Sequence, residues 1–175
     1  MELKPDEAML LSRARGEIEG NQQSPLTVLC RDRDGAGYFM RLEFGSKEDK
    51  EATLEVLENF FLWRRITSYT LSCEVWLVTR DRDNLPKGAA ADCEDRQEAL
   101  SLLSVDGEVK RLLLFPITSS DGNRQLGTVP QVSEANRGRL ANLMLLPGGD
   151  VPAHVRHALD IIFEQVPTFP MGDKT

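Results

Sequence analysis

Three carboxylates and an arginine in the middle of the chain are of the types that acid–base chemistry uses. Glu74 lies inside the apolar run "LSCEVWLV", and Asp95, Arg96 and Glu98 follow further along the chain. Because a charged side chain within a strand is disfavoured, Glu74 needs a polar partner. Two acidic side chains held together can transfer protons or bind a metal. A structural ion pair, in which Arg96 or Arg111 holds Glu74, is the alternative that we favour.

A second candidate site consists of His154, His157 and Asp160, which recur at three-residue spacing in a predicted helix. Side chains at this spacing share a helix face, as the ligands of a metal do. The chain has no other histidine, so carboxylates or a distant cysteine would have to complete a zinc site. We therefore expect solvated helix residues here, and no metal or other cofactor.

Cys93 is the cysteine that merits consideration as a nucleophile, because it lies in a polar loop. Its acidic neighbours Asp92 and Glu94 raise a thiol pKa and reduce the thiolate fraction. An ordinary surface cysteine is thus favoured over a pair with one of the two histidines. The motif "PGGD" at 147–150 precedes a predicted helix, where an anion can bind. Asp150 occupies that position and no P-loop lysine follows, so a helix stop and cap is expected.

Composition places the chain among ordinary globular proteins. It has 175 residues, 41% of them apolar and 28% charged, with a net charge of −7. The acidic surface and the absence of a basic stripe argue against binding to nucleic acid or to anionic membranes. Three widely spaced cysteines, no secretory signal and no membrane-length apolar run indicate a reducing cytoplasm. We expect a single domain over residues 1–175, with a flexible N-terminal segment and C-terminal tail.

The first half of the chain predicts a helix, a hairpin and a second, longer helix. Residues 6–19 have weak helical periodicity, and residues 26–30 and 38–44 form a strand pair around the turn signal Asp34-Gly35. Ser46 caps a helix over residues 46–66, whose wide apolar arc predicts burial against a sheet. Alternation over residues 69–78 predicts a strand with Cys73 in its apolar row. We also expect both Trp63 and Trp76 to be buried.

The second half predicts another hairpin and further helices. Residues 98–105 and 108–117 flank Asp106-Gly107, which is a strong hairpin signal. The polar residues 118–131 are expected to form a loop, and helices are expected over residues 133–146 and 150–165. The fold class is therefore α+β. A mostly antiparallel sheet of about five strands carries the long helix on one face, with terminal helices around it.

The middle of the chain resembles a pattern in uncharacterised small bacterial and phage-type proteins. In that pattern one strand reads Ser-Glu-Ala-Trp, and Pro-Asp-Arg-x-Glu-Ala precedes a hairpin. The resemblance covers residues 69–117, with Val75 in place of the small residue and Cys93-Glu94 in place of the proline. The matching residues are Glu74, Trp76, Asp95, Arg96 and Glu98. The resemblance implies a strand, a loop and a hairpin, and no activity.

Three functions remain open from the sequence. A protein that acts through contacts with other proteins, or with its own copies, is favoured because motifs for nucleotides, metals and catalytic triads are missing. An enzyme with a cleft lined by Glu74, Asp95, Arg96 and Glu98 is the first alternative. An acidic inhibitor that mimics nucleic acid is the second, and a row of exposed carboxylates would favour it.

Overall fold

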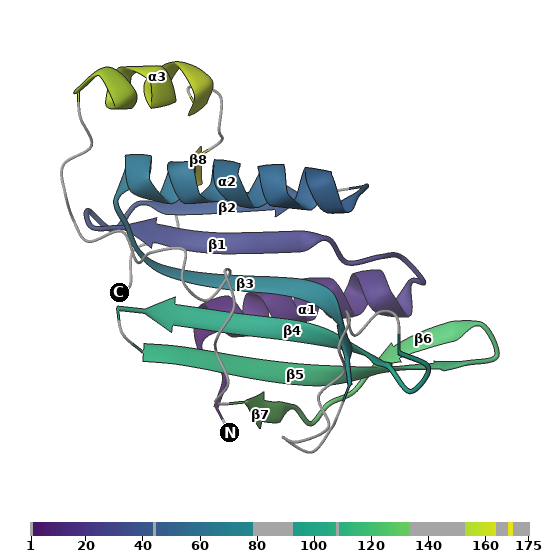
Figure 1. Cartoon of the computed structure of the whole chain (residues 1–175). Coiled ribbons are helices and arrows are strands. Elements are labelled where there is room, and N and C mark those ends of the chain that lie inside the picture. The colour runs from purple at the N-terminus through teal and green to yellow at the C-terminus, as the bar shows by residue number, and fades with distance from the viewer. Residues whose placement is uncertain are drawn as a thin grey trace, which may run out of the picture.

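The protein is an α+β structure built on an antiparallel sheet (Figure 1). The computed structural model describes residues 2–43, 45–78, 93–107, 109–133, 153–163 and 168–169. Within these residues the sheet has eight strands in the order β6-β5-β4-β3-β1-β2-β8, and β7 also pairs with β5. Every strand pair is antiparallel. The elements are α1 (Pro5–Glu19), β1 (Leu26–Asp32), β2 (Gly37–Leu42), α2 (Lys47–Arg64), β3 (Ile66–Leu77), β4 (Gln97–Asp106), β5 (Val109–Ser120), β6 (Asn123–Leu126), β7 (Gln131–Ser133), α3 (Ala153–Phe163) and β8 (Thr168–Phe169).

Helix α1 covers one face of the sheet (Figure 1). Its buried side chains Leu10, Ala14 and Ile18 recur every four residues and so share one side of the helix. They pack against buried residues of β1, β4, β5 and β6, among them Leu29 and Phe115. This face of the sheet is called the α1 face below.

Helix α2 covers the opposite face, and α3 lies against α2 on the side away from the sheet (Figure 1). Leu54, Leu57 and Phe60 of α2 are buried against β1, β2, β3 and β4. The Trp63 indole donates a hydrogen bond to the Asp160 carboxylate of α3. Because successive side chains of a strand point to opposite faces, the two helices bury alternate residues of the same strands.

The sheet is larger than the sequence indicated. The estimate of about five strands is wrong, because it omitted the short strands β6, β7 and β8. The predicted loop over 118–131 instead contains the end of β5, a tight turn at Asp121-Gly122, and β6. Asp121 and Gly122 both have positive φ, at 52° and 78°, as the two central residues of a type I′ turn do.

The remaining predictions about elements differ in outcome. Ser133 ends β7, and the rest of the helix predicted over 133–146 lies outside the described residues, as does "PGGD" at 147–150. Among the described helices, none is long and apolar enough to cross a membrane.

The two tryptophans differ in burial. Trp63 is partly buried against the α2 side of the core. Trp76 is 42% exposed, so its predicted burial is wrong. It lies on the α1 face two residues beyond Glu74, and it is not part of the buried cluster that packs against α1.

Candidate functional site

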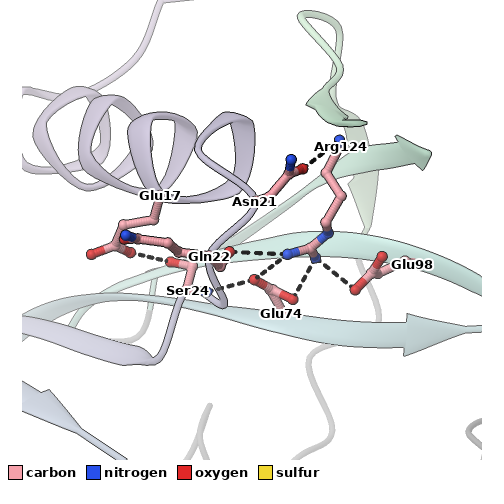
Figure 2. A network of polar contacts seen from close by, with 7 residues as sticks. All are labelled: Glu17, Asn21, Gln22, Ser24, Glu74, Glu98 and Arg124. Atoms are coloured by element: carbon pink, nitrogen blue, oxygen red, sulfur yellow. Dashed lines mark hydrogen bonds and ion pairs between the residues drawn. The ribbon is translucent and has the colours of Figure 1, made fainter. Parts of the chain in front are cut away.

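Arg124 of β6 holds two carboxylates from neighbouring strands (Figure 2). Its Nη2 lies 2.7 Å from Oε2 of Glu74 on β3 and 2.7 Å from Oε1 of Glu98 on β4. Its Nη1 lies 3.5 Å from Oε1 of Glu74. We call these three residues the Glu–Arg–Glu cluster. It unites two residues that the sequence singled out with an arginine that it did not.

The register of the sheet brings the two carboxylates together. β3 and β4 pair so that Glu74 faces Leu100 and Trp76 faces Glu98. Glu74 and Glu98 are therefore diagonal neighbours on the same face, a distance that long side chains can span. Arg124 reaches them because the turn at Asp121-Gly122 folds β6 back along β5.

The loop between α1 and β1 closes the Glu–Arg–Glu cluster from the side (Figure 2). The backbone N–H of Ser24 donates to Oε1 of Glu74 at 2.5 Å, and Arg124 Nη1 donates to the Gln22 carbonyl at 3.0 Å. The Asn21 side chain accepts a hydrogen bond from the Arg124 backbone N–H at 2.9 Å. These bonds fix the path of the chain from α1 into β1.

The Glu–Arg–Glu cluster is mostly shielded from water. The exposed fractions of the side chains are 11% for Glu74, 23% for Glu98 and 18% for Arg124. Burial raises the pKa of the Glu98 carboxyl, and the nearby Glu74 carboxylate raises it further, although Arg124 acts in the opposite direction. Hydrogen bonding to Glu74 raises the pKa of Arg124, so the guanidinium remains charged. Two carboxylates thus share one cation, and its raised pKa means that Glu98 protonates more readily than an ordinary glutamate.

The predicted partners of Glu74 are wrong. Arg111 pairs instead with Glu7 of α1, whose buried carboxylate lies 3.3 Å away. On β5, Arg111 lies opposite Ser104 of β4, whereas Glu74 lies opposite Leu100 of β4. Arg96 stacks over the ring of Trp76, with 4.6 Å from its guanidinium carbon to the ring centroid. The sequence signal for the true partner was the Asp121-Gly122 turn, which brings Arg124 back to the sheet.

The other candidate residues lie away from the Glu–Arg–Glu cluster. Asp95 is exposed in the turn before β4, and Cys93 is partly buried at the start of that turn. His154 and His157 are exposed on α3, and Asp160 accepts the bond from Trp63. No group of three metal-ligating side chains occurs in the described part of the chain.

A cavity of about 450 Å³ lies beside Glu74, where β1 begins, β2 ends and β3 continues. A volume of this size is at the lower end of the range for ligand sites. Cys73 lies in its wall, and burial raises the pKa of that thiol to about 11, so the thiol stays protonated at neutral pH. The lining residues are Gln23, Ser24, Pro25, Leu26, Leu42, Glu43, Gly45, Cys73 and Glu74.

The hydrogen bonds of the Glu–Arg–Glu cluster connect parts of the chain with one another. Both Nη atoms of Arg124 donate to acceptors within the chain, and Oε1 of Glu74 accepts from the Ser24 backbone. A catalytic arginine needs donors directed at a substrate, whereas these are directed at β3, β4 and the loop before β1. The arrangement therefore joins four segments of the chain.

The chain matches no protein-family model, and neither a curated protein nor a solved structure is significantly similar to it.

Proposed function

We propose that this is a cytoplasmic protein that acts by binding another protein through the surface around Trp76 and Arg96. The observation that carries the proposal is the exposure of Trp76. This residue is 42% exposed to solvent, and the guanidinium of Arg96 stacks on its ring. Tryptophan and arginine are the residue types that contribute most to binding energy at protein interfaces. A tryptophan left this exposed by the fold has an apolar surface for a partner to cover.

The rigid support of this surface also favours recognition. Trp76 and Glu98 face each other on β3 and β4, and Glu98 is held by Arg124. A partner that covers Trp76 would therefore meet side chains that are already ordered, which lowers the entropic cost of association. A second copy of this chain is one such partner.

The two alternative functions have less support. The donors of Arg124 are used within the chain, which weighs against an enzyme that uses the carboxylates around Glu74. Glu48, Glu51 and Glu55 line the exposed side of α2, but they extend over about 10 Å of helix. Such a short row is a poor imitation of a nucleic acid backbone.

A photo-crosslinking amino acid at position 76, introduced into the full-length chain in its native cells, tests the proposal. We expect discrete adducts with one partner protein at position 76, and none with the same amino acid at the exposed position Thr118. Light scattering of the purified chain at several concentrations decides whether the partner is a second copy. Equal, diffuse labelling from both positions would refute a binding surface at Trp76.

A further inference from the structure

A second cavity, of about 330 Å³, lies where α1 begins, at the end of the sheet away from the Glu–Arg–Glu cluster. We call it the α1 cavity. Its volume is at the lower end of the range for small-molecule sites. Its wall is built from residues at the start of α1 and from the adjoining ends of β1, β3 and β4. Polar side chains of this wall are Lys4, Arg31, Ser68, Thr70, Ser104 and Asp106.

The register of the sheet brings these polar side chains together. Arg31 of β1 faces Ser68 of β3, which faces Asp106 of β4. In the neighbouring row Thr70 faces Ser104, whose hydroxyl group bonds to α1. Residues two apart on a strand share a face, and so do residues directly opposite each other on neighbouring strands. The two rows therefore form one polar patch on the α1 face, where the helix begins.

Two hydroxyl groups lead from the α1 cavity to the buried carboxylate of Glu7. Ser104 donates to Oε1 of Glu7 at 2.9 Å, and the hydroxyl oxygens of Thr70 and Ser104 lie 3.2 Å apart. A hydroxyl group has one proton, and that of Ser104 is used for Glu7, so Thr70 is the donor to Ser104. Arg111 pairs with the same carboxylate, which is 1% exposed. The Thr70 oxygen is therefore left with lone pairs only, and it presents an acceptor to the cavity.

The charged side chains of the α1 cavity comprise one ion pair and two single groups. Arg31 lies 3.0 Å from Asp6, so their charges offset each other. Lys4 and Asp106 are exposed, and neither side chain forms an ion pair within the described part of the chain. The cavity therefore has one unpaired charge of each sign, together with the buried acceptor of Thr70. A ligand with a charge of one sign would satisfy only one of the two.

We propose that the α1 cavity binds a free α-amino acid, whose ammonium group donates to Thr70 and Asp106 and whose carboxylate lies towards Lys4. A protonated amine has three donors and no acceptor, which suits an oxygen that has no proton to give. Hydrogen bonds with one charged partner are roughly twice as strong as those between neutral groups. The site is distinct from the surface around Trp76, so it goes beyond the proposed function and does not depend on it.

Thermal unfolding of the full-length protein with each standard amino acid tests the proposal. We expect one amino acid, or a group with similar side chains, to raise Tm as its concentration increases to about 10 mM. The same amino acid with an acetylated amino group should lose at least about tenfold in affinity by isothermal titration calorimetry, because no ammonium is left to donate. Its carboxamide should lose about fivefold, since Lys4 then meets a neutral group.

Variants of the protein assign the binding to this cavity. Thr70→Val keeps the shape of the side chain and removes the acceptor, so it should weaken binding about tenfold, whereas Thr70→Ser should retain it. Asp106→Asn keeps a residue that suits the turn at Gly107 and should weaken binding about fivefold. Thr27→Val changes another buried threonine of the sheet, outside the cavity, and should leave the affinity within about twofold. Circular dichroism of each variant establishes that it is folded.

Contrary outcomes separate the parts of this inference. If no amino acid raises Tm at about 10 mM, the site does not exist as proposed. Binding that survives acetylation or Thr70→Val would overturn the placement of the ammonium group, and binding that survives conversion to the carboxamide would overturn the role of Lys4. Equal losses in Thr27→Val and Thr70→Val would trace the effect to packing and overturn the assignment to this cavity. Crosslinking at Trp76 is independent of all these results, so the proposed function is tested separately.

Discussion

Replacing Glu98 by glutamine is expected to stabilise the protein at neutral pH, although it removes one carboxylate of the Glu–Arg–Glu cluster. Glutamine keeps a side-chain oxygen to accept from Arg124, whose Nη2 lies 2.7 Å from Oε1 of Glu98. Its amide can also donate to the Glu74 carboxylate, which the glutamate cannot do when ionised. The variant therefore removes a repulsion and keeps the hydrogen bond.

The pKa of Glu98 gives the sign of the effect. It is raised in the folded protein by burial and by Glu74, so folding favours the protonated form. The stability that this proton contributes is fully present below the unfolded pKa of about 4.3 and is lost as the pH rises through the folded pKa. Because the side chain is 23% exposed and paired with Arg124, we expect a modest gain at pH 7, about 0.5–1 kcal/mol.

Urea unfolding followed by circular dichroism at pH 4 and pH 7 measures both quantities. We expect the free energy of unfolding of Glu98→Gln to match that of the natural chain at pH 4 and to exceed it at pH 7. Glu43→Gln is the control, since Glu43 is 79% exposed and should change stability by less than about 0.5 kcal/mol. A loss of more than about 1 kcal/mol in Glu98→Gln at pH 7 would refute the reasoning, because the ion pair would then outweigh the repulsion.

Three other changes test the same description. Arg124→Met should destabilise the protein by about 2–3 kcal/mol at pH 7 and by less at pH 4, because it leaves two shielded carboxylates without their cation; an effect in urea unfolding below about 0.5 kcal/mol would contradict this. Trp76→Ala should cost less than about 1 kcal/mol and shift the tryptophan emission to shorter wavelength, since the more exposed indole is removed. In a Cys93→Ser background, Cys30 and Cys73 should react with Ellman's reagent at pH 8 at least about tenfold more slowly than free cysteine, because burial raises both thiol pKa values; rapid labelling of the folded chain would show that one of them is accessible.

The fold class and several strands could be predicted because they depend on local patterns. The alternation of residues in β3 and the Asp106-Gly107 turn are short-range signals that tertiary packing did not override. The same turn signal at Asp121-Gly122 was missed, because β6 is short and polar and has no apolar alternation. The exposure of Trp76 was missed for another reason. How much of the sheet α1 covers depends on packing rather than on a local sequence pattern.

The candidate site was predictable in part. The sequence indicates that a carboxylate within β3 needs a partner, and Glu74 has one. It does not identify which arginine, because Arg96, Arg111 and Arg124 all follow within reach of a folded chain. That choice depends on the register of β4 with β5 and of β5 with β6, which no residue type encodes locally.

The Glu–Arg–Glu cluster and the cavity beside Glu74 are physically connected. Arg124 and Glu74 hold Gln22 and Ser24, and Ser24 belongs to the wall of the cavity. Shielded ion clusters contribute little net stability compared with apolar packing, and their better supported role is to fix one arrangement of the chain. The cluster therefore fixes the loop before β1 against β3. The same charges order Glu98, which faces Trp76 across β3 and β4, and so they support the surface at which we propose that a partner binds.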